Sequence, residues 1–362
     1  MEEIFPIQND DTTVRGFTKK DNRVKTYERN KNGSLSFGGN GMHTFRELSS
    51  AFEKQFASAH FPEQPKSLYD AAQYLLTLGG KRIRPVMCLM GNEMFSDISK
   101  DAYHVATAIE LFHNFTLIHD DIMDKAPLRR GMPTTHKKFG ESTALLAGDV
   151  MLVVGYENLN KVHVDYLPKV LTLFNRTARE VCEGQQLDMD FEKMTDVNFD
   201  DYLKMVTLKT SVALAASLQL GGILGGAGHG NQEHLYEFGK NLGIAFQVQD
   251  DYLDAFGNPE KFGKKQGGDI MANKKTFLLL QAMKVATDAQ RNELDDLLKR
   301  NDENKIEAVL NMYKACNVDE WAKELKQKYF SISMDHLEEI AVLSARKKPL
   351  EELAKYLMER DV

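Results

Sequence analysis

The chain has 362 residues, 42% of them hydrophobic, so it is long enough to bury a sizeable core in one large domain or two ordinary ones. Its formal net charge of −7 argues against a nucleic-acid surface, because such surfaces are usually basic. The cysteines, Cys88, Cys182 and Cys316, form no Cys-x-x-Cys pair and are typical of a reducing cytoplasm. No run of about 18 apolar residues occurs, so the sequence predicts no transmembrane segment.

Residues 1–41 differ from the rest of the chain in composition. They are polar, mix acidic and basic side chains and end in SFGGNG. The segment lacks the apolar stretch of a signal peptide, and its acidic residues argue against a transit peptide. We expect a disordered extension over 1–41, followed by one domain over 42–362. Because Met42 opens the first helical pattern, both Met1 and Met42 stay open as the start.

From Met42 onward the chain favours helices. Long stretches rich in Leu, Ala, Glu, Lys and Met contain little proline, and no series of short alternating strands is present, so the fold class is predicted to be all-α. Ser67 is a candidate N-cap for a helix that Gly79-Gly80 would end. The apolar run 211–227 contains Ser, Gln and glycines, which favours a buried core helix. Further helices are predicted over residues 101–124, 145–159, 169–191 and 231–254, and from 275 to the end.

Two predicted helices end in the same acidic pattern, DDxxD. Residues four apart share one face of a helix, so the first and last aspartate of each cluster point the same way. Carboxylates at a helix C-terminus oppose the helix dipole, which calls for a compensating cation. Carboxylate oxygens suit Mg²⁺, and this ion commonly bridges carboxylates to substrate phosphates. A solvated acidic helix end is the alternative, and two copies make it the weaker one. The clusters are Asp120, Asp121 and Asp124, then Asp250, Asp251 and Asp254.

Basic residues accompany both acidic clusters. Arginine binds phosphate oxygens through two parallel hydrogen bonds, and lysine acts as a point charge. The cations outnumber what one magnesium-neutralised diphosphate needs, so two anionic groups are predicted, one held through magnesium and the other directly. Arg82 stays ambiguous, and for Lys265 or Lys275 alone a surface position is the better interpretation. The cations are Lys81, Arg82, Arg84, Arg129, Arg130, Lys209, Lys264, Lys265, Lys274 and Lys275.

Six motifs occur in an order that resembles the trans-isoprenyl diphosphate synthases, the polyprenyl synthetase family. They are GGKRIRP, LIHDDIMDKAPLRRG, GQQLDM, KT, FQVQDDYLD and GGDI-x₃-K, and the resemblance runs from about residue 44 to the C-terminus. It implies a helical bundle of the isoprenoid synthase type with a deep central cavity. It also implies a short-chain enzyme of the geranylgeranyl or farnesyl diphosphate synthase type, active as a homodimer. The largely apolar helix over 101–124 is the expected site of subunit pairing.

The resemblance implies a magnesium-dependent, head-to-tail condensation. An allylic diphosphate (dimethylallyl, geranyl or farnesyl) would bind through about three Mg²⁺ ions between the two clusters. Its diphosphate leaves, the double bond of isopentenyl diphosphate attacks the allylic cation, and a proton is lost. The product is an all-trans allylic diphosphate one isoprene unit longer. Apolar helices before both clusters are consistent with the need to keep water from such a cation.

Residue roles follow from matching the motifs. The resemblance assigns magnesium to Asp120, Asp121, Asp124 and Asp250, with Asp254 acting through a water. It assigns the allylic diphosphate to Arg129, Lys209, Lys264 and Lys274, beside a cation pocket lined by Thr210 and Gln247. It assigns isopentenyl diphosphate to Lys81, Arg84, His113 and Arg130, flanked by Phe246. Lys264 is preferred to Lys265 because it directly follows Gly263.

Product length is predicted from the helix that carries Asp120. Phe115 and Thr116 stand five and four residues before it, where a growing chain would end. One aromatic residue five positions before an uninterrupted motif resembles geranylgeranyl synthases, so C20 is expected, with C15 as runner-up. In the alternative, Phe115 is plain core and the floor lies at Phe112 or on a partner subunit.

Two other functions compete with this interpretation. A class I terpene cyclase also ionises an allylic diphosphate in an all-α fold, but it needs no second diphosphate site, and GGKRIRP and LRRG argue against it. A non-catalytic subunit of a heteromeric synthase would tend to lose motif residues, and none is missing here.

Overall fold

The computed structural model describes residues 41–257, 266–302 and 304–359, together with the backbone of three short strands near the N-terminus. These strands, β1 (Thr13–Gly16), β2 (Lys25–Arg29) and β3 (Leu35–Phe37), form an antiparallel sheet in the order β1-β2-β3. They belong to a unit that spans Met1–Met42. The sequence does not predict this sheet. The rest of residues 1–40 lies outside the described part, so the expected disorder there stays a prediction.

The second unit, His43–Val362, is built from helices, which confirms the predicted all-α class. Its first helices are α1 (Phe45–Phe56), α2 (Lys66–Thr77), α3 (Ile83–Glu93) and α4 (Lys100–Met123). Thr44 and Glu47 form a capping box at α1, and the Ser99 hydroxyl caps α4. The prediction of Ser67 as an N-cap is wrong, because α2 begins at Lys66 behind Pro65.

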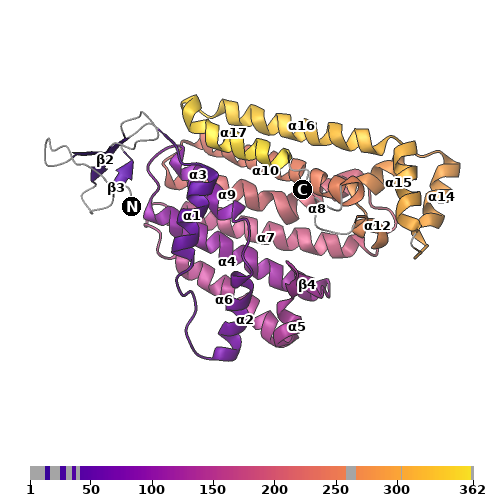
Figure 1. The fold of residues 1–362 in the computed structure, drawn as a ribbon, viewed down its shortest axis with the longest axis horizontal. Helices are drawn as coiled ribbons and strands as arrows, with labels where there is room; N and C mark the ends of the chain where they lie inside the picture. The colour runs from indigo at the N-terminus through magenta and orange to yellow at the C-terminus, as the bar shows by residue number, and fades with distance from the viewer. Residues whose placement is uncertain are drawn as a thin grey trace. The chain divides into compact units, whose positions relative to one another are not determined.

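Helix α4 runs through the interior of the bundle (Figure 1). It packs against α6 (Glu141–Leu159) and α3, and its residues from Ala102 to Phe112 are mostly buried. The apolar character from which the sequence predicts subunit pairing is therefore accounted for within one chain. Its last turn carries the first acidic cluster, and a hairpin over residues 128–133 follows it.

A tight hairpin follows the first acidic cluster. Strands β4 (Leu128–Arg129) and β5 (Met132–Pro133) pair antiparallel across Arg130 and Gly131, both of which have positive φ, 52° and 77°. Two positive φ values at the centre of a two-residue loop give the turn type whose twist matches a hairpin. Helices α5 (Thr135–Phe139), α6 and α7 (Leu167–Phe191) come next.

The most apolar segment is a continuous helical run with a π-helical turn in its middle. It comprises α8 (Phe199–Val206), the π-helix η1 (Thr207–Ser211) and α9 (Val212–Leu224). By length and composition, Phe199–Leu224 would suffice to cross a membrane, but 67% of its most apolar window is buried inside the protein. This burial confirms the predicted core helix. The π-helical turn contains Lys209 and Thr210, and such turns are frequent at functional sites.

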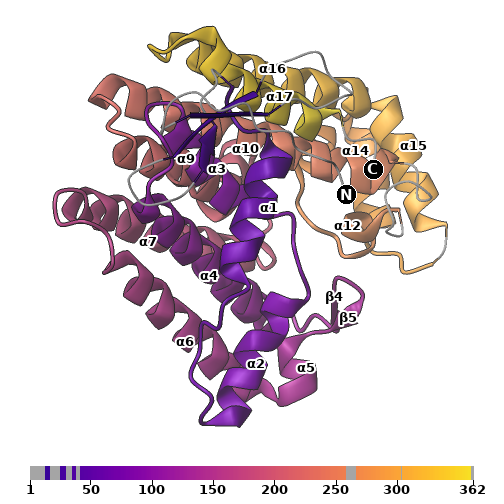
Figure 2. The same ribbon diagram turned by 60° about the vertical axis from the view of Figure 1, so that its left-hand side comes forward.

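Helix α10 (His229–Phe256) carries the second acidic cluster and packs against α9 and α16 (Val318–Glu339). Figure 2 shows α16 and α17 (Ser344–Met358) stacked along one side of the bundle, with α14 and α15 beyond its end. A separate apolar cluster joins the end of α10 to the helices that follow it. Those helices are α12 (Gly268–Met271), α13 (Phe277–Val285), α14 (Asp288–Leu298) and α15 (Lys305–Ala315).

Candidate active site

A cavity of about 410 Å³ opens between α4, α7 and the π-helical turn, within the usual range of ligand sites. Its wall combines charged and polar groups at the motif residues with apolar groups deeper along α4 and α7. The predicted residues that line it are Arg84, His113, Phe115, Thr116, Asp120, Lys209 and Thr210. The sequence thus predicts a large part of this wall, from three separate motifs and from the helix that precedes the first acidic cluster.

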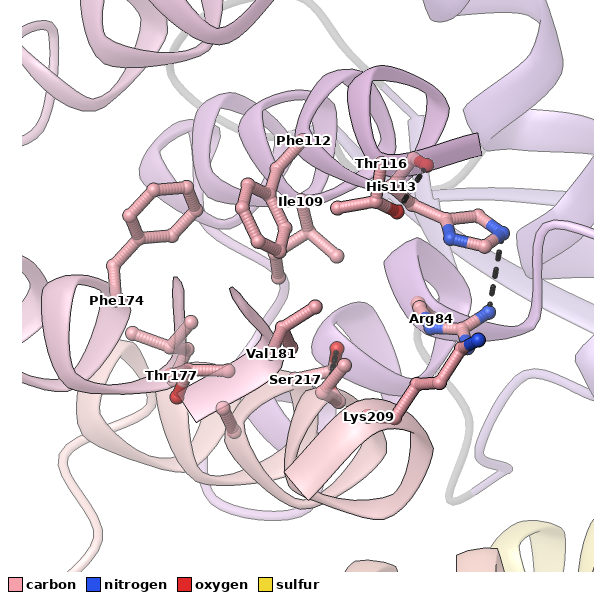
Figure 3. Close-up of a pocket in the computed structure, with 13 residues that line it drawn as sticks. Arg84, Ile109, Phe112, His113, Thr116, Phe174, Thr177, Val181, Lys209 and Ser217 are labelled. Carbon is pink, nitrogen blue, oxygen red and sulfur yellow. Dashed lines mark hydrogen bonds between the residues drawn. The ribbon is translucent and has the colours of Figure 1, made fainter. Parts of the chain in front are cut away.

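A second, narrower cavity of about 40 Å³ shares the same polar end (Figure 3). Arg84, His113 and Lys209 lie at one end, and the rings of Phe112 and Phe174 close the other. These two rings meet edge to face, with centroids 5.5 Å apart. A diphosphate at the cationic end would leave its hydrocarbon tail facing apolar side chains, which is the polarity that a prenyl diphosphate requires.

The first acidic cluster holds its carboxylates in different surroundings. Burial raises the pKa of Asp120 to about 6 against the opposing influence of Lys209, and the neighbouring Asp124 raises it further. The Asp120 carboxyl therefore lacks a full set of positive partners in the protein itself. Asp124 is exposed at the C-cap of α4, as expected for a cluster that ends its helix.

Asp121 is buried and lines neither cavity. Both of its oxygens accept hydrogen bonds from Arg129, at 2.8 Å from Nε and 2.7 Å from the terminal nitrogen. This bidentate pair fastens the β4–β5 hairpin to the end of α4. In this structure the predicted magnesium ligand and the predicted phosphate ligand bind each other, so a substrate contact of Arg129 would compete with the Asp121 pair.

Arg84 and His113 form the core of the predicted second diphosphate site. An Arg84 terminal nitrogen lies 3.2 Å from His113 Nε2. Burial and the nearby guanidinium groups of Arg84 and Arg130 lower the pKa of His113 well below its ordinary value. The imidazole is therefore neutral, and Nε2 can accept a hydrogen bond that fixes the Arg84 fork. Arg130 donates to the carbonyl of Gly79, which joins the hairpin turn to the GGKRIRP loop.

Lys209 is held by a carboxylate that the sequence analysis leaves without a role. Lys209 Nζ lies 2.6 Å from Asp188 Oδ2, and Asp188 belongs to the GQQLDM motif on α7. One turn earlier on α7, Gly184 packs directly on the π-helical turn. A Cβ added there would lie 2.3 Å from the backbone nitrogen of Lys209. The glycine thus permits the close approach that brings Asp188 to Lys209.

The aspartates of the second acidic cluster also lie in different surroundings. Asp251 is buried and accepts hydrogen bonds from Gln247 at 2.8 Å and Tyr202 at 3.0 Å. Burial raises the pKa of Asp251 to about 7, although both hydrogen bonds oppose that rise. Asp250 lies next to it and is partly exposed. Gln247, predicted to line the cation pocket, is engaged with Asp251 and lies outside the two cavity walls.

Asp254 is hydrogen-bonded to the start of α12. Its Oδ2 accepts a hydrogen bond of 2.9 Å from the Asp269 backbone, which supports an indirect role. Lys274 Nζ lies 3.4 Å from Asp269 Oδ1. Although burial lowers its pKa, the carboxylates of Asp269, Asp188 and Asp124 raise the pKa of Lys274 overall. Lys274 is therefore under the influence of Asp124 in the first cluster, and its partner Asp269 is bonded to Asp254 in the second.

Other predicted residues stand apart from the two cavities. Lys81 is exposed, and Phe246 is half-buried on α10 one turn before Asp250. Lys264, with its alternative Lys265, lies outside the described residues. Lys275, expected at the surface, is partly buried and donates to the carbonyl of Phe191 at 2.6 Å.

The donor set fits Mg²⁺ bound together with a diphosphate. In the part of the chain that the structure describes, no three His, Cys, Asp or Glu side chains lie close enough to hold a metal ion alone. Magnesium usually keeps several waters and bridges few carboxylates to substrate phosphates, so such a site is completed by its ligand. The raised pKa of Asp120 indicates a carboxylate that an arriving cation would stabilise.

Sequence reasoning missed several residues of the site. Asp188 and Gly184 lie inside a quoted motif, and their spacing of four residues was the available signal. Tyr202, Phe174 and Thr177 carry no local signal, because only the packing of α7 and α8 against α4 and α10 brings them to the site.

Comparisons with known proteins agree with this geometry. The chain is 37% identical over 302 residues to a geranylgeranyl pyrophosphate synthase of Geoglobus acetivorans, covering 83% of this chain and 92% of that relative. It is 34% identical over 316 residues to a geranylfarnesyl diphosphate synthase of Natronomonas pharaonis, covering 82% and 91%. A solved geranylgeranyl pyrophosphate synthase structure aligns with TM-score 0.84 and 41% identity over 88% of this chain and 99% of that one. The family model for polyprenyl synthetases matches residues 65–316, and the chain belongs to the polyprenyl synthetase family.

Proposed function

We propose that this protein is a trans-prenyltransferase that condenses isopentenyl diphosphate with an allylic diphosphate and releases diphosphate. The carrying observation is the 410 Å³ cavity, whose wall joins Asp120 and Lys209 to Arg84 and His113. Those residues supply one carboxylate for a metal and two cations, Lys209 and Arg84, for two anionic groups around one cavity. Membership of the polyprenyl synthetase family supports the same chemistry.

Binding is divided between the two ends of the site. Asp120, Asp124 and Asp250, with Asp121, would hold Mg²⁺, and Asp254 would act through a water. When bound, the ions stabilise the charge that develops on the departing diphosphate. About three ions per site is what the resemblance to the polyprenyl synthetase family implies.

The chain's own cations complete the clamp. Lys209 would move from Asp188 to the allylic diphosphate, a short displacement for a flexible ammonium group. Arg129, Lys264 and Lys274 would add further positive charge at the leaving group, and Thr210 and Gln247 would face the allylic cation. No protein nucleophile is needed, because the departing diphosphate can itself accept the proton lost from the new chain.

Isopentenyl diphosphate would bind at Arg84 and His113, with Lys81 and Arg130 at its oxygens and Phe246 beside it. His113 is neutral and adds no positive charge to the site. Its ring nitrogen holds the Arg84 guanidinium at the cavity. Fixed cations of this kind stabilise an anion without reorganising when it arrives.

The proposed product is C20, with C15 as runner-up. Phe115 and Thr116 line the larger cavity one turn before Asp120, in the place expected for its floor. Relatives named for geranylgeranyl and geranylfarnesyl products support a short chain.

A homodimer is proposed from the exposed apolar face of α6. Leu145, Leu146, Val153 and Tyr156 are between 38% and 56% exposed and lie on one face of that helix. Water-exposed apolar stripes of this kind mark protein interfaces. The pairing surface therefore lies on α6 rather than on the buried α4.

A cytoplasmic location is proposed from the cysteine pattern. Residues 42–362 are proposed as the synthase domain. A chain that begins at Met42 should keep the parent's rate, and a marked loss would show that the N-terminal unit contributes to catalysis.

The test is diphosphate release from purified protein with Mg²⁺. Release should require both isopentenyl diphosphate and an allylic diphosphate. A terpene cyclase would release diphosphate from the allylic substrate alone, and a non-catalytic subunit would release none, so either result would overturn the proposal.

A further inference from the structure

One arginine of the GGKRIRP loop faces away from both cavities. The Arg82 side chain is 3% exposed, and its guanidinium bonds two carboxylates, with Nε 2.7 Å from Glu53 Oε1 and a terminal nitrogen 2.5 Å from Glu110 Oε1. The other terminal nitrogen lies 3.4 Å from the Leu76 carbonyl oxygen, and the group sits 5.1 Å from the Phe56 ring centroid. A single side chain thus joins α1, α2 and α4 to the start of α3.

The backbone conformation of Arg82 depends on these side-chain contacts. Arg82 is the N-cap of α3 with φ 50° and ψ 30°, a left-handed conformation that is unfavourable for a residue with a Cβ. Its side chain makes no N-cap hydrogen bond. The conformation is therefore maintained by side-chain ion pairs outside the turn rather than by the turn itself.

This turn decides where its neighbours point. Lys81 precedes it, and Arg84 stands two residues after it in the first turn of α3, where it reaches His113. Glu110 accepts the hydrogen bond from Arg82 and lies on α4 one turn before His113 and Asn114. Asn114 Nδ2 also donates a hydrogen bond to Glu110, at 3.1 Å. The Arg82–Glu110 pair therefore fixes the GGKRIRP loop to the helix that carries its partner histidine.

We propose that Arg82 is a positioning residue, whose ion pairs with Glu110 and Glu53 set Lys81 and Arg84 against His113 for isopentenyl diphosphate. This inference rests on the proposed function, because that function assigns the second diphosphate to these groups. Lysine should not reproduce these contacts, since its three donors sit on one nitrogen, whereas Arg82 bonds its acceptors from three nitrogens of a planar fork.

Kinetics with each substrate varied separately test the proposal. Arg82→Lys should raise the KM for isopentenyl diphosphate about tenfold, and Glu53→Gln about threefold, with the KM for the allylic substrate changed by less than about twofold. Glu53 is 45% exposed on its side chain, so Glu53→Gln should fold and decides the question if Arg82→Lys does not.

The matched control acts on the other end of the same helix. Arg346 donates to the carbonyls of Glu93 and Met94 at the end of α3, at 3.0 and 3.1 Å. Arg346→Lys should lower the melting temperature and leave both KM values unchanged.

Folded Glu53→Gln with a parental KM for isopentenyl diphosphate, or equal rises in both KM values, would overturn the positioning role. If the parent protein fails to condense its substrates, the proposed function fails instead. Calorimetric titration of isopentenyl diphosphate into parent and variants would then still measure whether Arg82 controls the loop.

Discussion

At Asp120 the fold keeps a carboxyl group where its negative charge is disfavoured. Burial raises its pKa to about 6. The ionised form, which would bind a metal, is therefore disfavoured in the folded state. As the pH rises through that value, the folded state becomes less stable. Side chains retained at such a cost are candidates for function.

Asp120→Ala is therefore expected to lower kcat by about 10³-fold, because the leaving diphosphate loses a metal ligand. The free energy of unfolding at neutral pH should stay within about 0.5 kcal/mol of the parent or rise, since a disfavoured charge is removed. Asp250→Ala should behave alike in activity. Turnover assays and chemical denaturation measure both quantities.

Asp288→Ala is the matched control, because Asp288 is a fully exposed carboxylate on α14. It should leave turnover unchanged and lower the free energy of unfolding by at most about 1 kcal/mol, because Asp288 stands in the first turn of α14 near Arg291. Activity within a few-fold of the parent for Asp120→Ala would show that the first cluster does not bind a catalytic metal.

The floor of the product cavity is a second question at this scale. Phe115 lines the 410 Å³ cavity and packs on His119, with the two ring centroids 4.7 Å apart. Phe112 closes the 40 Å³ cavity. Because a long tail needs the larger space, Phe115→Ala should lengthen the main product beyond C20, and Phe112→Leu should not. Chromatography of dephosphorylated products decides, and the reverse pattern would move the floor to Phe112.

Between elements, α7 and the π-helical turn approach each other closely at Gly184. Gly184 leaves no room for a side chain, since an added Cβ would lie 2.3 Å from the Lys209 nitrogen and 2.7 Å from the Leu208 carbonyl carbon. Gly184→Ala should push α7 outward, cost about 1–3 kcal/mol of stability and weaken the Asp188–Lys209 pair. Thermal unfolding and the KM for the allylic substrate report these effects.

A second helical glycine provides the control. At Gly155 on α6 an added Cβ would meet its nearest atom, the Ala108 carbonyl oxygen, at 3.6 Å, an ordinary contact. Gly155→Ala should be neutral or stabilise by up to about 1 kcal/mol, because alanine favours helix. If both substitutions have the same effect, helix propensity rather than the α7–η1 contact explains the result.

The sequence predicts helices and motif residues well where the signal is local. The spacing of Asp120 and Asp124 and the helical pattern of 101–124 depend on neighbours along one helix, and both are recovered in α4. The π-helical turn at Thr207–Ser211 is not predicted, because its extra residue is accommodated by packing against α7. The Arg82 ion pairs join residues 28 and 29 positions apart, a distance at which no periodicity applies.

For the whole molecule, the exposed face of α6 raises the question of assembly. Leu146 is 56% exposed in the single chain, so Leu146→Glu should have little effect on a monomer. If that face pairs two chains, the buried charge should disrupt the dimer, and light scattering should give a mass near 41.0 kDa instead of twice that value.

Leu343→Glu is the control for that substitution, because Leu343 is 76% exposed and lies just before α17. Its mass should equal the parent's. A parent protein that is already a monomer in solution, and active, would refute the proposed homodimer.

The most direct test of the central claim is the product made by the purified protein from farnesyl diphosphate, isopentenyl diphosphate and Mg²⁺. Dephosphorylation and chromatography should reveal one all-trans C20 alcohol, with one diphosphate released for each bond formed. Cyclic hydrocarbons, or farnesol without elongation, would contradict the assignment of two diphosphate sites around one cavity.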